Sequence, residues 1–243
     1  MKDRLLAVCA ANGLSIGDFA AQKLIEYMDL VLEFNEHTNL TAITDPDQFI
    51  LRHLADSLTV VSEITKYNCR SLADIGSGAG MPGIPLAIAL PDLQVVMVDS
   101  TRKKVDFIKS AIEKLGLANA SAVWGRAEEL AAVRAPMREK YSAAVARAVA
   151  AMPVILEYEA PFVLPGGHLF VMKGPGAGSE PDWRKAAKVL GLDLTDRREL
   201  TLRSPGSAPE EEISRRIYTF SKPNALSSKY PRRAGKAVKE PIV

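Results

Sequence analysis

The stretch Leu72-Ala-Asp-Ile-Gly-Ser-Gly-Ala-Gly-Met-Pro-Gly83 decides the fold of this chain. The apolar run from Ser71 to Ile75 has the length of a buried strand, and Gly76, Gly78 and Gly80 follow it directly. Glycines let a backbone turn tightly and approach a ligand closely, and the helix that follows offers free N–H groups. The stretch therefore predicts a strand, a ligand-binding turn and a helix, the first unit of a Rossmann-like sheet.

Short apolar runs alternate with helical patterns downstream of this turn, which is typical of a parallel sheet with crossover helices. One helix is predicted by Val105, Ile108 and Ile112 at three- and four-residue spacing, and Gly116 ends it. Further strands are expected at residues 95–98, 122–124, 143–146, 168–172, 193–202 and 213–220, the last two antiparallel. We therefore expect an α/β fold with a mostly parallel seven-stranded sheet.

The chain before the sheet reads as helical. Apolar residues within 18–38 form one stripe at helical spacing, and Asp45 followed by Pro46 is a helix-start signal. We expect a helical N-terminal extension over residues 1–66 and the sheet domain over 67–222. Residues 223–243 are predicted to be a basic C-terminal tail, since Glu240 is their only acid.

Composition narrows the class of protein. The 243 residues are 47% hydrophobic and 25% charged, which excludes a disordered chain, and the net charge of +2 does not by itself indicate nucleic-acid binding. The longest apolar run, 84–90, contains Pro85 and is too short to cross a bilayer. Cys9 and Cys69 lack partners at metal-ligand spacing. We expect a reduced, cytoplasmic monomer without metal, membrane contact or protein partner.

Acidic residues near the glycines indicate which cofactor the turn binds. Gly78, Gly80 and Gly83 match the dinucleotide pattern, so an NAD-dependent oxidoreductase stays an alternative. Asp74, however, would repel a pyrophosphate and attract a cationic amino group. Asp99 ends the second strand, where it can accept two ribose hydroxyls, and residues 126–129 follow the third strand, where an adenine fits. This constellation predicts S-adenosylmethionine, although the same acids can also be plain helix caps.

Several longer motifs carry a resemblance to one family. They are D-I-G-S-G-A-G-M-P-G-I-P at 74–85, F-N-E-H-T-N-L-T-A-I at 34–43, R-H-L-A-D-S-L at 52–58, A-R-A at 146–148 and K-Y-P-R-R-A-G-K at 229–236. With these motifs the chain resembles the glucose-inhibited division protein B family, the small-subunit ribosomal RNA methyltransferases G, over nearly its whole length. The resemblance implies a class I S-adenosylmethionine-dependent methyltransferase that methylates guanine N7 in the 530 loop of 16S ribosomal RNA.

The resemblance also implies specific cofactor contacts in this chain. They fall on Gly76, Met81, Ala127 with Glu128, and Arg147. Members often have Phe or Leu where this chain has Met81, a tolerable apolar exchange. Asp74, Gly78 and Asp99 are added on the physical argument above.

The methyl transfer to guanine N7 requires no acid or base from the protein. The N7 lone pair attacks the methyl group without losing a proton, so placement of the reactants can supply most of the acceleration and no general base is needed. Arg147, at a strand end facing the cofactor crevice, is the candidate catalytic residue, because it can bind the cofactor or the RNA, or orient guanine O6.

RNA binding requires cations that neutralise phosphates and a group that stacks on a base. The candidates are Arg52, His53, Lys173, Arg197, Tyr230, Arg232 and Arg233. The polar group of Asn39, Arg52, His53 and Asp56 has a second interpretation, a hydrogen-bonded bridge that packs helix onto sheet. A non-catalytic RNA-binding ribosome-assembly factor is the remaining alternative function. The expected partner is 16S ribosomal RNA or the 30S subunit.

Overall fold

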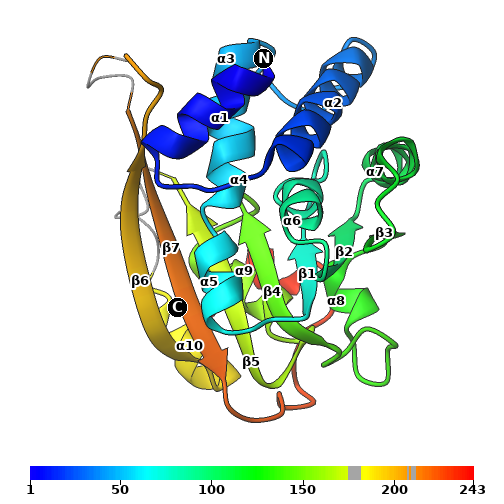
Figure 1. The fold of residues 1–243 in the computed structure, drawn as a ribbon. Helices are drawn as coiled ribbons and strands as arrows, with labels where there is room; N and C mark the ends of the chain where they lie inside the picture. Colours follow the sequence, from blue (N-terminus) through cyan, green and yellow to red (C-terminus); the bar gives the residue numbers. More distant parts are fainter. Residues whose placement is uncertain (175–181, 207, 209–211) are drawn as a thin grey trace.

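The computed structural model describes residues 1–174, 182–206, 208 and 212–243. Its centre is a seven-stranded sheet in the order β3-β2-β1-β4-β5-β7-β6 (Figure 1). The strands are β1 (Ser71–Ile75), β2 (Gln94–Asp99), β3 (Ala120–Trp124), β4 (Tyr141–Arg147), β5 (Val163–Lys173), β6 (Asp193–Leu202) and β7 (Ile213–Lys222). The five neighbouring strands β3, β2, β1, β4 and β5 pair in parallel, and β7 runs antiparallel to both β5 and β6. The prediction of a mostly parallel seven-stranded sheet is confirmed.

Helices cover both faces of the sheet (Figure 1). They are α1 (Lys2–Ala11), α2 (Asp18–Asn35), α3 (Pro46–Phe49), the π-helical η1 (Ile50–Ala55), α4 (Asp56–Leu58), α5 (Val61–Lys66), α6 (Gly83–Ala89), α7 (Arg102–Leu115), α8 (Ala127–Leu130), α9 (Met152–Glu159), α10 (Arg184–Leu190) and α11 (Lys236–Lys239). In the ranges that the structure describes, no helix combines the length and the apolar character needed to cross a membrane.

The strand side chains alternate between two cores, as the period of a β-strand requires. Leu72, Val95 and Val145 face the core formed with the N-terminal helices, α6 and α7. Ala73 and Val96, their neighbours along the chain, face the core formed with α9 and α10. Because both faces of the central strands are buried, these strands are continuous apolar runs in the sequence.

The N-terminal helices begin and continue as the sequence signals indicate, with one interruption. Asp45 caps α3, since its Oδ1 accepts from the backbone N of Gln48 at 2.9 Å, and Pro46 is the first helical residue. The helix then widens into the π-helical turn η1, which the apolar periodicity does not predict. There the carbonyl oxygens of Arg52 and His53 each lie 3.4 Å from an Arg147 guanidinium nitrogen. The wide turn thus joins the helical extension to the end of β4.

The C-terminal segment packs back onto the molecule. Leu226 and Ala237 are buried, and the guanidinium of Arg138 donates to the carbonyl oxygens of Leu226 at 3.0 Å and Tyr230 at 2.8 Å. Helix α11 lies against α9. Within residues 223–243, predicted as a basic tail, Leu226, Tyr230 and Ile242 therefore pack on the second core, whereas Lys229, Arg233 and Lys239 are exposed.

Candidate functional site

The glycine turn after β1 has the conformation that only glycine adopts readily. Gly76 and Gly78 have φ of +73° and +61°, in the left-handed region. A Cβ on Gly76 would lie 2.8 Å from Cγ2 of Val149, in the loop that follows β4. The two loops therefore approach each other closely because residue 76 has no side chain.

Asp74 is completely buried beneath this turn. Its Oδ2 accepts from the backbone N of Gly83 at 2.8 Å, whereas its Oδ1 has no hydrogen-bond partner among the described residues. Burial raises the pKa of this carboxyl to about 7, although the bond from Gly83 and the charge of Arg147 lower it in part. A buried, unpartnered carboxylate oxygen fits a cationic ligand group such as the ammonium of S-adenosylmethionine.

Asp99 closes the other side of the turn from the end of β2. Its Oδ2 accepts from Gly78 N at 2.9 Å and its Oδ1 accepts from Thr101 N at 2.8 Å. These bonds fix the carboxylate, and each oxygen keeps a lone pair for a further donor. The geometry therefore fits the ribose hydroxyls for which Asp99 was predicted.

A cavity of about 120 Å³ extends from Asp99 between β1, β2 and α8. Its walls include Ile75, Val98, Ala127 and Val149, and Gly76 lies at its edge. Apolar walls beside a ribose-binding acid suit an adenine ring.

Glu128 also lines this cavity, but its carboxylate is already partnered. Its Oε1 accepts from the backbone N of Gly235 at 2.8 Å and lies 3.3 Å from the Arg126 guanidinium. The C-terminal segment thus holds one wall residue of the cavity. Met81, another predicted cofactor contact, is buried in the first core under the glycine turn. It lines neither this cavity nor the second cavity, which is described next.

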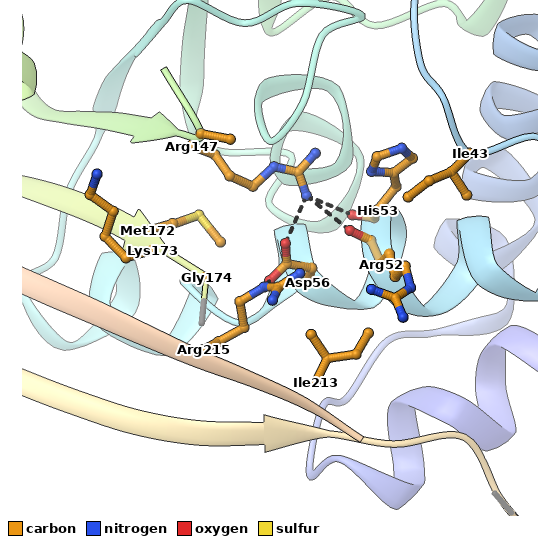
Figure 2. Close-up of a pocket in the computed structure, with 11 residues that line it drawn as sticks. Ile43, Arg52, His53, Asp56, Arg147, Met172, Lys173, Gly174, Ile213 and Arg215 are labelled. Carbon is orange, nitrogen blue, oxygen red and sulfur yellow. Dashed lines mark hydrogen bonds and ion pairs between the residues drawn. The ribbon is translucent and has the colours of Figure 1, made fainter. Parts of the chain in front are cut away.

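A second cavity, of about 390 Å³, lies beside Arg147 (Figure 2). Asp56 projects into it between two arginines: its Oδ2 lies 3.0 Å from Nη1 of Arg147, and its Oδ1 lies 2.8 Å from Nε of Arg215. The three side chains come from β4, α4 and β7. Ala148, which also lines the cavity, has φ of +56°, a strained conformation for alanine. Arg147 and Ala148 therefore line this second cavity, and the next residue, Val149, lines the first.

Two of the predicted RNA-binding residues at this cavity are tied into the protein. His53 Nε2 lies 2.7 Å from the Thr41 hydroxyl, and burial, with the nearby charge of Arg147, lowers the pKa of His53 to about 3. His53 is therefore neutral at physiological pH. Lys173 is largely buried, and its Nζ donates to the carbonyl oxygen of Ala150 at 2.7 Å. Arg52, the third, donates to the Gln48 side chain at 2.6 Å.

The remaining predicted RNA-binding residues lie outside both cavities. Arg197 is exposed on β6, pairs with Glu199 and lies over the Tyr218 ring. Tyr230 is half-buried against the second core. Arg232 forms two close bonds, of 2.6 and 2.8 Å, to the buried carboxylate of Glu157. Arg233 is exposed.

Arg215 is a charged residue of the second cavity that the sequence analysis did not single out. It lies in a predicted strand beside Arg216, and nothing in the strand pattern distinguishes the two arginines. The alternation along β7 decides: Arg215 reaches Asp56, whereas Nε of Arg216 lies 3.1 Å from Glu199 on β6. Only the pairing of β7 with its neighbours could have indicated this.

Comparisons with known proteins agree with this geometry. Residues 20–196 match the model of the GidB family, described as rRNA small subunit methyltransferase G. A protein of that name from Alkaliphilus oremlandii is 39% identical, covering 100% of this chain and 99% of its own, and one from Lactobacillus helveticus is 42% identical, covering 89% and 88%. A Galdieria sulphuraria structure assigned as a sarcosine dimethylglycine methyltransferase shares the fold, with a TM-score of 0.51, 13% identity, and coverage of 70% and 86%. The methyltransferase fold expected from the sequence is therefore confirmed, and the chain belongs to the family of ribosomal RNA small subunit methyltransferases G.

Proposed function

We propose that this chain transfers the methyl group of S-adenosylmethionine to N7 of a guanine in the 530 loop of 16S ribosomal RNA. As a member of its family the chain is a ribosomal RNA methyltransferase. The observation that carries the finer proposal is the adjacency of the two cavities at the end of the parallel strand β4: Arg147 and Ala148 line the second cavity, and the next residue, Val149, lines the first. Ligands of such sheets bind at this edge.

The first cavity and the glycine turn are the proposed cofactor site. Asp74 holds the amino group, Gly76 and Gly78 give the backbone its close approach, and Asp99 accepts the ribose hydroxyls. Ala127 and Glu128 border the adenine. When bound, the cofactor supplies an activated methyl group on a positively charged sulfur.

The second cavity is the proposed site of the target base. Arg147 borders it from the end of β4 and is the candidate catalytic residue. Its role is to orient the guanine while N7 attacks, and a proton acceptor is unnecessary because N7 carries no proton. The neutral His53 in the same cavity agrees with a site that orients rather than titrates.

The RNA-binding surface is proposed around this cavity. Arg52 borders it as a partly exposed cation, Lys173 adds positive charge from its largely buried wall, and Arg197 and Arg233 offer exposed cations farther away. Arg232 and Tyr230 act through the shape of the C-terminal segment, because both are engaged within the protein. Phosphate contacts from such dispersed residues make binding salt-dependent without a large net charge.

Transfer of labelled methyl groups to 16S RNA and to 30S particles from cells lacking this protein tests the proposal. The modified base is located by chain cleavage at N7-methylguanine. We expect one cleavage site in the 530 loop, and no transfer by Asp74→Ala or Gly76→Val. Label on another atom or another loop would overturn the assignment of the base, and full transfer by both variants would overturn the cofactor site.

The two alternative functions predict different results. An NAD-dependent oxidoreductase would bind NADH and not S-adenosylhomocysteine, and membership in a methyltransferase family speaks against it. A non-catalytic assembly factor would bind RNA tightly without binding the cofactor. The unpartnered Asp74 oxygen and the open cavity beside Asp99 favour a working cofactor site.

A further inference from the structure

One carboxylate in the second cavity holds two guanidinium groups that are far apart in the sequence (Figure 2). Asp56 is 3% exposed, and the side chains of Arg147 and Arg215 are 13% and 15% exposed. Two cations on one anion leave a net positive charge at the cavity wall. Buried ion pairs contribute little net stability, because desolvation offsets their attraction. The arrangement is therefore better explained by what the arginines bind.

Arginine donors at a cavity wall are suited to one edge of a guanine. On that edge O6 and N7 are both acceptors, and a free arginine commonly binds them together. Such a bidentate contact would block N7, the atom that must attack. Asp56 takes Nη1 of Arg147 and Nε of Arg215. These bonds fix the orientation of each guanidinium and leave fewer of its N–H groups for a ligand in the cavity.

We propose that Arg215 is a specificity-determining residue that donates to O6 of the target guanine, and that Asp56 positions it so that N7 stays free. This inference rests on the proposed function, in which guanine N7 is the acceptor. An adenine carries an amino group in place of O6. This amino group is a donor, so it cannot accept a hydrogen bond from a guanidinium. The cavity therefore selects guanine by O6.

Asp56 has a second effect, on charge. As the N7 lone pair forms the new N–C bond, the C–S bond breaks with its electron pair on sulfur, and the positive charge passes from sulfur to the purine. No proton moves in this step. A cationic purine beside Arg147 and Arg215 is repelled, and the Asp56 carboxylate offsets that repulsion. Asp56 is thus a positioning residue.

The first test compares Arg215→Gln with Arg216→Gln. The control is the neighbouring arginine of the same strand, and it pairs with Glu199 outside the cavity. We expect Arg215→Gln to lower kcat/KM for methyl transfer about tenfold or more, and Arg215→Lys to recover part of the loss. Affinity for S-adenosylhomocysteine is expected to stay within about twofold in all three variants, which also shows that they are folded. Unchanged kcat/KM in Arg215→Gln would overturn the proposal.

The second test separates base recognition from a general loss. The guanine that the protein methylates is replaced by 2-aminopurine, which keeps N7 and lacks O6, in reconstituted small-subunit particles. We expect this exchange to cost the wild type about tenfold or more in kcat/KM, and Arg215→Gln less than about twofold. Equal losses in both proteins would assign Arg215 a structural role and overturn the proposal.

A binding test keeps the inference separate from the proposed reaction. The ¹H–¹⁵N signals of arginine Nε are followed while 5′-GMP, or the 2-aminopurine riboside monophosphate, is added to the protein with S-adenosylhomocysteine. Shifts of the Arg215 signal with 5′-GMP alone support O6 recognition, even if the methylated atom proves not to be N7. Equal shifts with both nucleotides, or none, would overturn the inference while leaving methyl transfer untouched.

Discussion

Asp74 gives the cofactor site a predictable dependence on pH. Its raised pKa of about 7 means that the free protein holds a proton on this carboxyl below neutral pH. A ligand ammonium favours the ionised form, so binding S-adenosylmethionine must release that proton. We expect affinity to increase by up to about tenfold per pH unit from pH 5.5 toward 7 and then level off. Calorimetry in buffers of different ionisation enthalpy measures the proton release.

Asp74→Asn is the control for this dependence, because it keeps the shape and removes the titration. We expect weaker binding by the variant and no proton release between pH 5.5 and 7. Equal proton release in the variant and the wild type would assign the titration to another group.

Gly76 is expected to tolerate no side chain. In Gly76→Ala the new Cβ meets Val149, a wall residue of the first cavity, at 2.8 Å, and φ of +73° adds strain. We expect S-adenosylmethionine to bind about tenfold or more weakly, measured by calorimetry, because Val149 must shift and it forms part of the cavity wall.

Gly116→Ala is the matched control for Gly76→Ala. Gly116 has φ of +61°, and a Cβ there meets nothing within 4 Å. Both variants are expected to lose about 1–2 kcal/mol of unfolding free energy from backbone strain, and only Gly76→Ala is expected to lose affinity. Weakened binding in Gly116→Ala would show that strain alone affects the site.

Site residues can be proposed from the sequence most directly where their geometry is local. Asp74, Gly76 and Gly78 lie within one turn, and the position of a turn after a strand defines what it can bind. The contacts of Asp56 with Arg147 and Arg215 span 91 and 159 residues and depend on the order of strands in the sheet. No local pattern contains that information.

Among the elements, the C-terminal segment has contacts that differ most from those its basic composition predicts. A basic composition indicates a solvated, RNA-binding tail, yet Arg232 bonds the Glu157 carboxylate on α9, which is 1% exposed. We expect Arg232→Ala to lower the unfolding free energy by about 2–4 kcal/mol in urea titrations, since it leaves a buried charge unpaired. The exposed Arg233 serves as control, and Arg233→Ala should change stability by less than about 0.5 kcal/mol.

A compensating substitution identifies the cause of that loss. Adding Glu157→Gln to Arg232→Ala removes the unpaired charge and is expected to restore part of the stability. A loss as large in Arg233→Ala as in Arg232→Ala would contradict the assignment of the ion pair as the main contact.

Elements were predictable where burial or capping marks them. Strand β1 has the predicted bounds because both of its faces are buried, and α3 starts at the predicted cap. The π-helical turn η1 was not predictable, since its apolar residues Ile50, Leu54 and Ala55 also fit an ordinary helix. What sets this turn apart from an ordinary helix is its contact with Arg147, which lies far away in the sequence.

At the scale of the whole molecule, the N-terminal helices and the sheet form one folding unit. Leu24 and Phe49 from the helices share a core with Met97 from the sheet, and the Tyr27 hydroxyl donates to the carbonyl oxygen of Ala79 in the glycine turn at 2.8 Å. The division at residue 66 predicted from the sequence therefore separates helical from alternating patterns and crosses a continuous core. We expect calorimetry to show one unfolding transition, with calorimetric and van't Hoff enthalpies equal within error.

A shortened chain of residues 67–243 tests whether the sheet can fold without the N-terminal helices. Without the N-terminal helices it exposes the part of the sheet face that they cover and loses the Tyr27 bond to the glycine turn, so we expect it to aggregate and not to bind S-adenosylhomocysteine. The full chain with Tyr27→Phe is the control, because it removes only the hydroxyl and should lose about 1 kcal/mol while still binding the ligand. Two separate transitions in the full chain, or wild-type affinity in the shortened one, would show that the sheet folds and holds its cofactor turn without the helices.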